Sequence, residues 1–168
     1  MSMVEYNKIE TVYRRDEKTK KLAVGEFNNP TLEFCKDLPW TFTEKVDGTS
    51  MRAYWDGHTV TFGGRTDRAQ IPAPLLDRMN ELFGGEANAQ LFEQKFGETE
   101  VILFGEGYGP KIQNGGGYRN DVDFIIFDTM IAGNYQPRSS VEDIAQFFGI
   151  DIVPIVLEGT VAEGVDYV

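Results

Sequence analysis

Residues 40–62 read WTFTEKVDGTSMRAYWDGHTVTF and contain three candidate β-strands in close succession. Asp56-Gly57 favours a type I′ hairpin turn between the last two, because both central residues of that turn need positive φ. β-branched and aromatic residues are frequent in all three runs. We therefore predict antiparallel strands over Trp40–Asp47, Met51–Trp55 and Thr59–Phe62.

The first of these strands has two chemically different faces, because successive side chains of a strand point in opposite directions. One face carries Trp40, Phe42, Glu44 and Val46, and the other carries Thr41, Thr43, Lys45 and Asp47. Gly48 follows directly and permits either the close approach of a ligand or backbone, or a turn with positive φ. The plainer interpretation is a solvated face with a Lys45–Asp47 pair.

The rest of the chain supplies helices next to short apolar strands. We predict a hairpin with a basic tip within residues 8–24, helices over Pro72–Phe83, Asn88–Phe96 and from a Ser139–Glu142 capping box to Gly149, and strands over Val101–Phe104, Val122–Phe127 and Ile150–Leu157. Hairpins outnumber crossovers, so the expected fold class is α+β (mixed α/β), with antiparallel sheets flanked by helices. No linker composition divides the chain, and we expect residues 1–168 to form a single domain.

Composition excludes several chemistries. Cys35 and His58 are the only residues of their types. An internal disulfide and a multi-cysteine zinc cluster are therefore excluded, and a Ser-His-Asp triad would have to use this single histidine. The net charge of −11 has the wrong sign for a domain that mainly binds phosphate backbones, and residues 112–168 contain no lysine. No apolar stretch is long enough to span a bilayer and the start MSMVEYNK is no signal peptide, so we expect a reduced, cytoplasmic location and no membrane partner.

Lys45-x-Asp47-Gly48 resembles the K-x-D-G motif of the covalent nucleotidyltransferases, which include ATP-dependent DNA and RNA ligases and mRNA capping enzymes. Further family motifs follow in order: Arg65 in GGRTD, Glu106 in ILFGEGYG and Phe127 in DFIIFD. Residues 105–128 look particularly like phage and bacterial RNA ligases. The resemblance covers roughly residues 8–157, and several ordered motifs are more specific than one.

The resemblance implies an ATP-grasp-like nucleotidyltransferase fold and a specific reaction. Lys45 would attack the α-phosphate of ATP, releasing pyrophosphate and leaving lysyl-AMP. AMP would then pass to a nucleic-acid 5′-phosphate, and a 3′-OH would seal the ends, with RNA favoured over DNA. ATP and Mg²⁺ are the implied cofactors. Because the attacking amine must be neutral, we expect a pocket that favours this form by partial burial, a nearby cation or a bound metal.

The resemblance also assigns roles within the site. Thr43 would contact the adenine edge, Glu106 the ribose hydroxyls and Phe127 the purine face, while Arg52 and Arg65 would neutralise phosphate charge. The predicted nucleotide-binding set is completed by Glu44, Asp47 and Gly48. A structural interpretation also exists for these residues: Phe127 as core, Glu106 paired with an arginine, and Arg65 in a surface turn. The sequence identifies no metal ligands and no oligomeric state.

Two later family motifs receive little support from the sequence. The K-x-K motif is absent because no lysine follows Lys111. Glu158-Gly159 and Glu163-Gly164 are candidates for the second glutamate motif, but a Thr160–Glu163 capping box favours a helix after residue 160 and a turn at Glu158-Gly159. We therefore expect the N-terminal part of an adenylyltransferase domain, incomplete at its C-terminus and impaired in activity.

Two other functions stay open at this point. The first is a non-catalytic ligase relative that binds a nucleotide or a nucleic acid. The second is an unrelated enzyme that uses Lys45 as a Schiff-base amine. A reaction with GTP is not excluded by Thr43 alone.

Overall fold

The computed structural model describes residues 3–168. The chain folds into two compact units. Unit 1 contains the residues up to Tyr6 and Lys45–Val153, and unit 2 contains Asn7–Glu44 and Pro154–Val168. The prediction that the chain is a single domain, the N-terminal part of an adenylyltransferase domain, stays a prediction.

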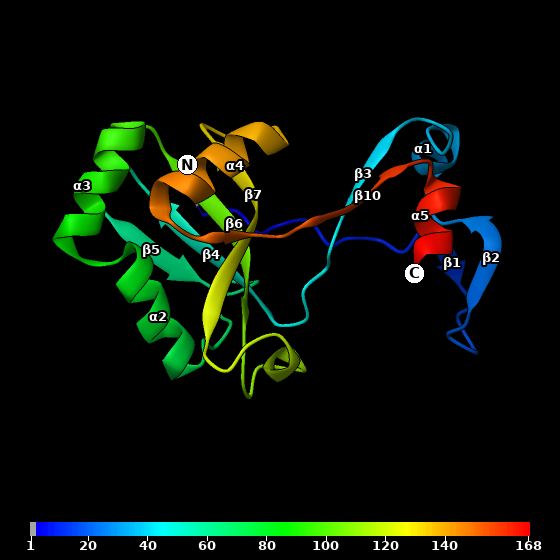
Figure 1. Ribbon diagram of the computed structural model, residues 1–168, viewed down its shortest axis with the longest axis horizontal. Helices are drawn as coiled ribbons and strands as arrows, with labels where there is room; N and C mark the ends of the chain where they lie inside the picture. Colours follow the sequence, from blue (N-terminus) through cyan, green and yellow to red (C-terminus); the bar gives the residue numbers. More distant parts are fainter. Residues whose placement is uncertain (1–2) are drawn as a thin grey trace. The chain divides into compact units, whose positions relative to one another are not determined.

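Unit 1 is built on a six-stranded sheet with the order β5-β4-β6-β7-β8, and β9 lies beside β7 (Figure 1). Its strands are β4 (Thr49–Trp55), β5 (Val60–Gly63), β6 (Val101–Tyr108), β7 (Asp123–Ile131), β8 (Asn134–Tyr135) and β9 (Asp151–Ile152). All of these pairs are antiparallel except β7 with β9. The predicted predominance of antiparallel pairing is therefore confirmed.

Three helices cover one face of this sheet: α2 (Ala73–Phe83), α3 (Gly85–Phe96) and α4 (Arg138–Phe148) (Figure 1). Leu75, Met79 and Phe83 of α2 are fully buried in the same core as Phe92 of α3. The spacing of these apolar residues made the helices predictable, because one helical stripe is sufficient to cover a sheet. Gly149 ends α4 in the left-handed conformation, with a φ of 66°.

Unit 2 consists of two small two-stranded sheets and two short helices. Its elements are β1 (Tyr13–Arg15), β2 (Leu22–Phe27), α1 (Pro30–Phe34), β3 (Trp40–Thr43), β10 (Ile155–Gly159) and α5 (Val161–Tyr167). β1 and β2 form the predicted hairpin, and β3 pairs antiparallel with β10. The Thr160–Glu163 capping box at the start of α5 is also confirmed.

Three predicted strand and turn details are wrong, each for a local reason. The strand that begins at Trp40 ends at Thr43, because its partner β10 begins opposite at Ile155 and is preceded by a proline, which has no backbone N–H to pair. The predicted strand over Ile150–Leu157 is two strands, β9 and β10, which pair in different units. Glu158-Gly159 is the end of β10 and not a turn.

Two predicted turn and cap features also differ from the structure. In the β4–β5 hairpin the central residues are Gly57 and His58, and only Gly57 has positive φ, so the turn is not type I′. The Asp56 carboxylate accepts hydrogen bonds from the backbone N–H groups of His58 and Thr59. Helix α4 begins at Arg138, before the predicted cap Ser139, and its N-cap is Pro137, which has no side-chain oxygen to accept a capping hydrogen bond. Glu142 accepts a hydrogen bond from Arg138 instead.

Candidate functional site

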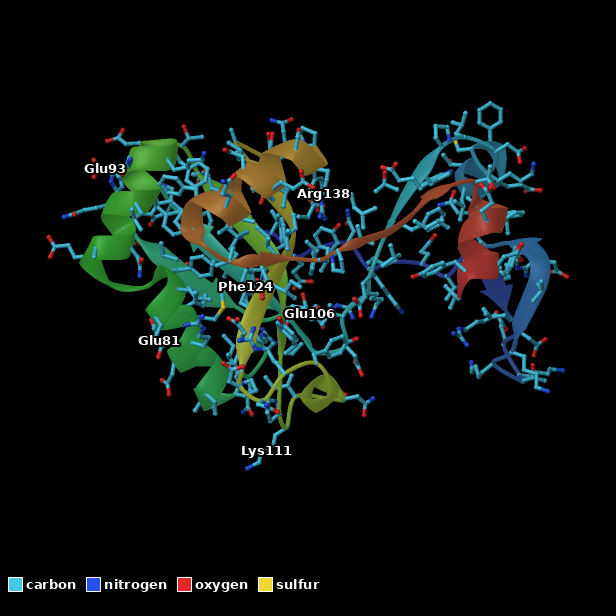
Figure 2. The ribbon with its side chains drawn as sticks, in the orientation of Figure 1. Glu81, Glu93, Glu106, Lys111, Phe124 and Arg138 are labelled. Atoms are coloured by element: carbon cyan, nitrogen blue, oxygen red, sulfur yellow. The ribbon has the colours of Figure 1, made fainter. Side chains whose placement is uncertain are left out.

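The candidate site lies on the face of the unit 1 sheet opposite the three helices. Ser50 of β4, Glu106 of β6 and Ile125 of β7 are direct cross-strand neighbours and therefore share one face. Phe124, one residue before Ile125, points into the helix-covered core instead. Figure 2 shows Glu106 and Phe124 on the two sides of the sheet.

The segment that carries Lys45 is a loop between β3 and β4, held on the sheet by one apolar side chain. Val46 is 5% exposed and packs with Tyr108, Ile125 and Val153. Its neighbour Lys45 is exposed. Of the three ways considered to favour the neutral amine, partial burial is therefore not supported, whereas a nearby cation and a bound metal stay predictions. The regular alternation of side chains between two faces ends with β3 at Thr43. The anchor that places Lys45 over this face is Val46.

Gly48 lies directly against strand β6. A Cβ atom at this position would be 2.2 Å from the carbonyl oxygen of Gly107 and 3.0 Å from Cγ of Glu106. Of the two reasons considered for a glycine here, the close approach of another backbone segment is therefore the one that the structure supports. The backbone of Gly48 also donates a hydrogen bond to the Glu106 carboxylate.

Burial raises the pKa of Glu106 to about 7. The positive charge of Lys45 and the hydrogen bond from Gly48 act in the opposite direction, while the negative charge of Asp47 adds to the rise. The carboxyl group of Glu106 thus lies within electrostatic range of both charged residues of the K-x-D-G motif. The structure brings Lys45, Asp47, Gly48 and Glu106 together, and no arginine pairs with Glu106 among the hydrogen bonds and ion pairs of residues 3–168.

Phe127 lies on the same face as Glu106, at an irregularity in strand β7. Phe104 pairs with Asp128 and Gly105 pairs with Ile126, so Phe127 is an extra residue between two regular pairs. Such a bulge reorients a side chain relative to the regular alternation. The half-buried ring packs edge-on against Tyr6, with 4.9 Å between ring centroids. The hydroxyl of Tyr6 donates to Asp128 at 2.9 Å, which fixes the ring beside Phe127.

The guanidinium group of Arg52 is fully buried and bound by protein groups. Nε donates to the carbonyl of Gly64 at 2.8 Å, and Nη1 donates to the carbonyls of Met3 and Val4 at 3.0 Å. Nη2 donates to Asp67 at 2.8 Å. These contacts leave it no access to a nucleotide, so the predicted phosphate-neutralising role of Arg52 is wrong. It acts instead as a structural link between β4 and two other segments.

The remaining predicted residues are less closely tied to this face. Arg65 is exposed in the loop after β5. Thr43 pairs with Ile155, and the backbone N–H of Glu44 donates to the carbonyl of Pro154 at 3.0 Å. Thr43 and Glu44 belong to unit 2. The nucleotide-binding roles of these three residues stay predictions.

Three residues of the site were missed by the sequence analysis: Val46, Tyr6 and Asn114. Asn114 Nδ2 donates to the Asp47 carboxylate at 2.9 Å. It precedes the short 3₁₀ helix η1 (Gly115–Gly117), where a Cβ atom on Gly115 would be 3.3 Å from the backbone oxygen of Asp47. The run of glycines was a visible signal for close packing, whereas nothing local to Tyr6 indicated its contact with Asp128, 122 residues away.

The part of the chain that the structure describes contains no group of three or more His, Cys, Asp or Glu residues placed to hold a metal ion. None of the helices within residues 3–168 combines the length and apolar character that crossing a membrane requires.

The family model described as RNA ligase matches residues 38–167. A comparison with curated proteins gives no significant match. Among solved structures, the chain is similar to a Naegleria gruberi RNA ligase mutant with ATP and Mn, with a TM-score of 0.64 and 20% identity over 79% of this chain and 40% of the other.

Two further structures of the Naegleria gruberi RNA ligase give the same result. For a mutant with AMP and Mn, the TM-score is 0.64 and the identity 19%, covering 80% of this chain and 42% of that one. For the ligase with PPi, the values are 0.62 and 21%, covering 79% and 40%. This chain thus spans about two fifths of the length of these structures, and the likeness establishes the predicted fold.

Proposed function

The chain belongs to the RNA ligase family, and we propose that it carries the lysine and most of the nucleotide-binding residues of an ATP-dependent RNA ligase. One observation supports this proposal above the others. The Lys45-Val46-Asp47-Gly48 loop rests on Glu106, on the sheet face that also carries Phe127. These are motifs separated by up to 82 positions in the sequence, and independent contacts bring them to one face.

In the proposed step, Nζ of Lys45 attacks the α-phosphorus of ATP. A P–N bond forms, the P–O bond to pyrophosphate breaks, and the amine loses a proton. Covalent attachment divides a difficult condensation into easier successive displacements. In the next displacement AMP passes from Lys45 to an RNA 5′-phosphate, and a 3′-OH then displaces AMP to seal the strand.

The surrounding residues orient the nucleotide. Glu106 contacts the ribose hydroxyls and Phe127 stacks on the purine, while Asn114 holds the Asp47 carboxylate beside the attacking amine. The exposed Arg65 supplies positive charge to the phosphates. The described residues offer no ligand set of their own for Mg²⁺, so we assign it no protein ligand.

The test is transfer of label from α-³²P-ATP to the chain in the presence of Mg²⁺. Lys45→Ala should lose the label, whereas Lys111→Ala, a control that removes another exposed lysine, should keep it. Because the chain has no K-x-K motif, we expect weak labelling, and the same pair of variants should be made in a version extended by any downstream coding sequence. Absence of label in both versions would contradict the proposal.

The alternative is a non-catalytic relative that binds the nucleotide without reacting. The exposure of Lys45 favours it. ATP would then raise the melting temperature by mass action, and no label would appear in either version of the chain.

A further inference from the structure

Positive charge is concentrated at the tip of the β1–β2 hairpin. Residues 14–21 read RRDEKTKK and contain five of the 16 Lys and Arg residues of the chain, with only two acids. The local net charge of +3 contrasts with −11 for the whole chain. All eight residues are exposed.

Elsewhere in the described chain, many positive side chains are neutralised by nearby carboxylates. The pairs are Lys36–Asp37, Arg52–Asp67, Arg78–Asp123, Lys95–Asp143, Arg119–Asp123 and Arg138–Glu142. Within residues 3–168, the ammonium groups of Lys18, Lys20 and Lys21 take part in no ion pair or hydrogen bond. The hairpin tip therefore presents cations that the fold itself does not use.

The exposed acid Asp16 binds the backbone of the tip. The carboxylate of Asp16 accepts hydrogen bonds from the backbone N–H groups of Lys18 and Thr19 at 3.0 and 2.6 Å. These bonds lower the pKa of Asp16, so it stays ionised and caps the turn. The recorded partners of this carboxylate are backbone N–H groups and not lysine ammonium groups.

The backbone of the tip is held in one conformation by its own hydrogen bonds. The N–H of Asp16 donates to the carbonyl of Lys21, and the N–H of Lys20 donates to the carbonyl of Asp16, both at 2.9 Å. Nη1 of Arg15 also donates to the carbonyl of Lys20 at 2.9 Å. A preformed turn loses less conformational entropy on binding than a flexible segment does.

We propose that this hairpin tip is a contact surface for the phosphate backbone of RNA, formed mainly by Lys18, Lys20 and Lys21. The inference rests on the proposed function for its choice of partner. A lipid bilayer is a less suitable partner than RNA, because residues 16–21 contain no apolar side chain that could enter the membrane interface. Clustered lysines match a polyanion through charge, without sequence specificity.

The experiment measures the affinity of the full chain for a nicked RNA duplex with a 5′-phosphate across a range of KCl concentrations. In the Lys18→Gln/Lys20→Gln variant, the slope of log K against log[KCl] should fall in magnitude by about 1.4–1.8, since each neutralised phosphate contributes roughly 0.7–0.9. Lys18→Glu/Lys20→Glu should weaken binding further.

The matched control is Lys36→Gln/Lys95→Gln, which makes the same change in net charge at two paired lysines. Its slope should match that of the unchanged protein. Equal slopes for the hairpin variant and the unchanged protein would overturn the proposal, as would equal losses in the hairpin and control variants. Stronger hairpin-dependent binding to anionic vesicles or polyglutamate than to RNA would also overturn it.

The two proposals can fail separately. Labelling of Lys45 by α-³²P-ATP needs no RNA, so the hairpin variants should be labelled as well as the unchanged chain. Failure of labelling alone counts against the ligase proposal, and an unchanged salt slope alone counts against the RNA contact.

Discussion

At the scale of single residues, burial controls the charge of Glu106. Its carboxyl group is half-buried on a sheet face shared with apolar side chains, and this raises its pKa to about 7. Near neutral pH the protonated and ionised forms are therefore both populated. The ionised form is held by Lys45 and by the Gly48 backbone, which are the groups next to the proposed attacking amine.

Glu106→Gln should change the pH dependence of stability. The folded state keeps the Glu106 proton up to about pH 7, whereas the unfolded state loses it near the ordinary value of 4.5. The stability that this group contributes is thus present below pH 4.5 and is lost as the pH rises to 7. Relative to Glu106→Gln, the unchanged protein should lose about 1–3 kcal/mol across this window, measured by urea unfolding.

Glu163→Gln is the control of opposite sign. Hydrogen bonds with Thr160 lower the pKa of Glu163, so its contribution is present at higher pH and lost on acidification. If the two variants gave differences of the same sign, the assignment of the Glu106 effect to burial would be contradicted.

Gly48→Ala should destabilise the fold by about 1–3 kcal/mol, because the added Cβ would overlap the carbonyl of Gly107 and force backbone movement. Gly117→Ala is the matched control, since no atom lies within 4 Å of a Cβ built there, and its unfolding midpoint should stay nearly unchanged. A Gly48→Ala midpoint equal to that of the control would show that the loop does not rest on β6 in solution.

At the scale of elements, strand β4 is joined to its surroundings through Arg52. This one side chain binds the carbonyls of Met3 and Val4 and the loop residues Gly64 and Asp67. The N-terminal segment that it holds also carries Tyr6, which packs against Phe127. Arg52 therefore helps to position Tyr6 beside Phe127 in the candidate site, although its own guanidinium group is buried away from the site.

Arg52→Gln should lower the free energy of unfolding by about 3 kcal/mol or more, because it leaves buried carbonyl groups without donors. Differential scanning calorimetry measures this loss. Arg68→Gln, at a nearby exposed arginine, should be close to neutral. A variant at Arg52 that kept its melting temperature but lost ATP affinity would instead restore the phosphate-binding role.

At the scale of the whole molecule, the two units differ in the apolar surface that they bury. Among the buried apolar side chains of residues 3–168, only Val161 belongs to unit 2. Unit 2 also exposes Ile9, Val24 and Phe34, which are 65%, 77% and 89% exposed. Unit 1 contains the continuous core between the sheet and its helices.

Native-state hydrogen exchange should therefore show two levels of protection. Amides of β4, β6 and β7 should exchange only with global unfolding, whereas those of β1, β2, β3 and β10 should exchange through local opening of lower free energy. Equal protection in both units would contradict this division of stability.

The sequence alone determined those features that depend on neighbours in the chain. The periods of apolar residues located α2, α3 and the strands β6 and β7, and Gly149 and the Thr160–Glu163 pair marked a helix end and a helix start. The order of the K-x-D-G, arginine, glutamate and aromatic motifs was sufficient to indicate the RNA ligase family. Nucleotidyl transfer through a lysine requires particular residue types at each of these motifs, so the motifs are visible in the sequence.

Only the tertiary structure decided where the predicted strand beyond Trp40 ends, what Arg52 binds and which residue supports Phe127. Each of these depends on at least one partner that is 48 to 122 positions away in sequence, such as Val4 for Arg52 or Asp128 for Tyr6. Local patterns contain no information about such partners. The pKa of Glu106 belongs to the same class, because burial and charge at a point in space are properties of the packed chain.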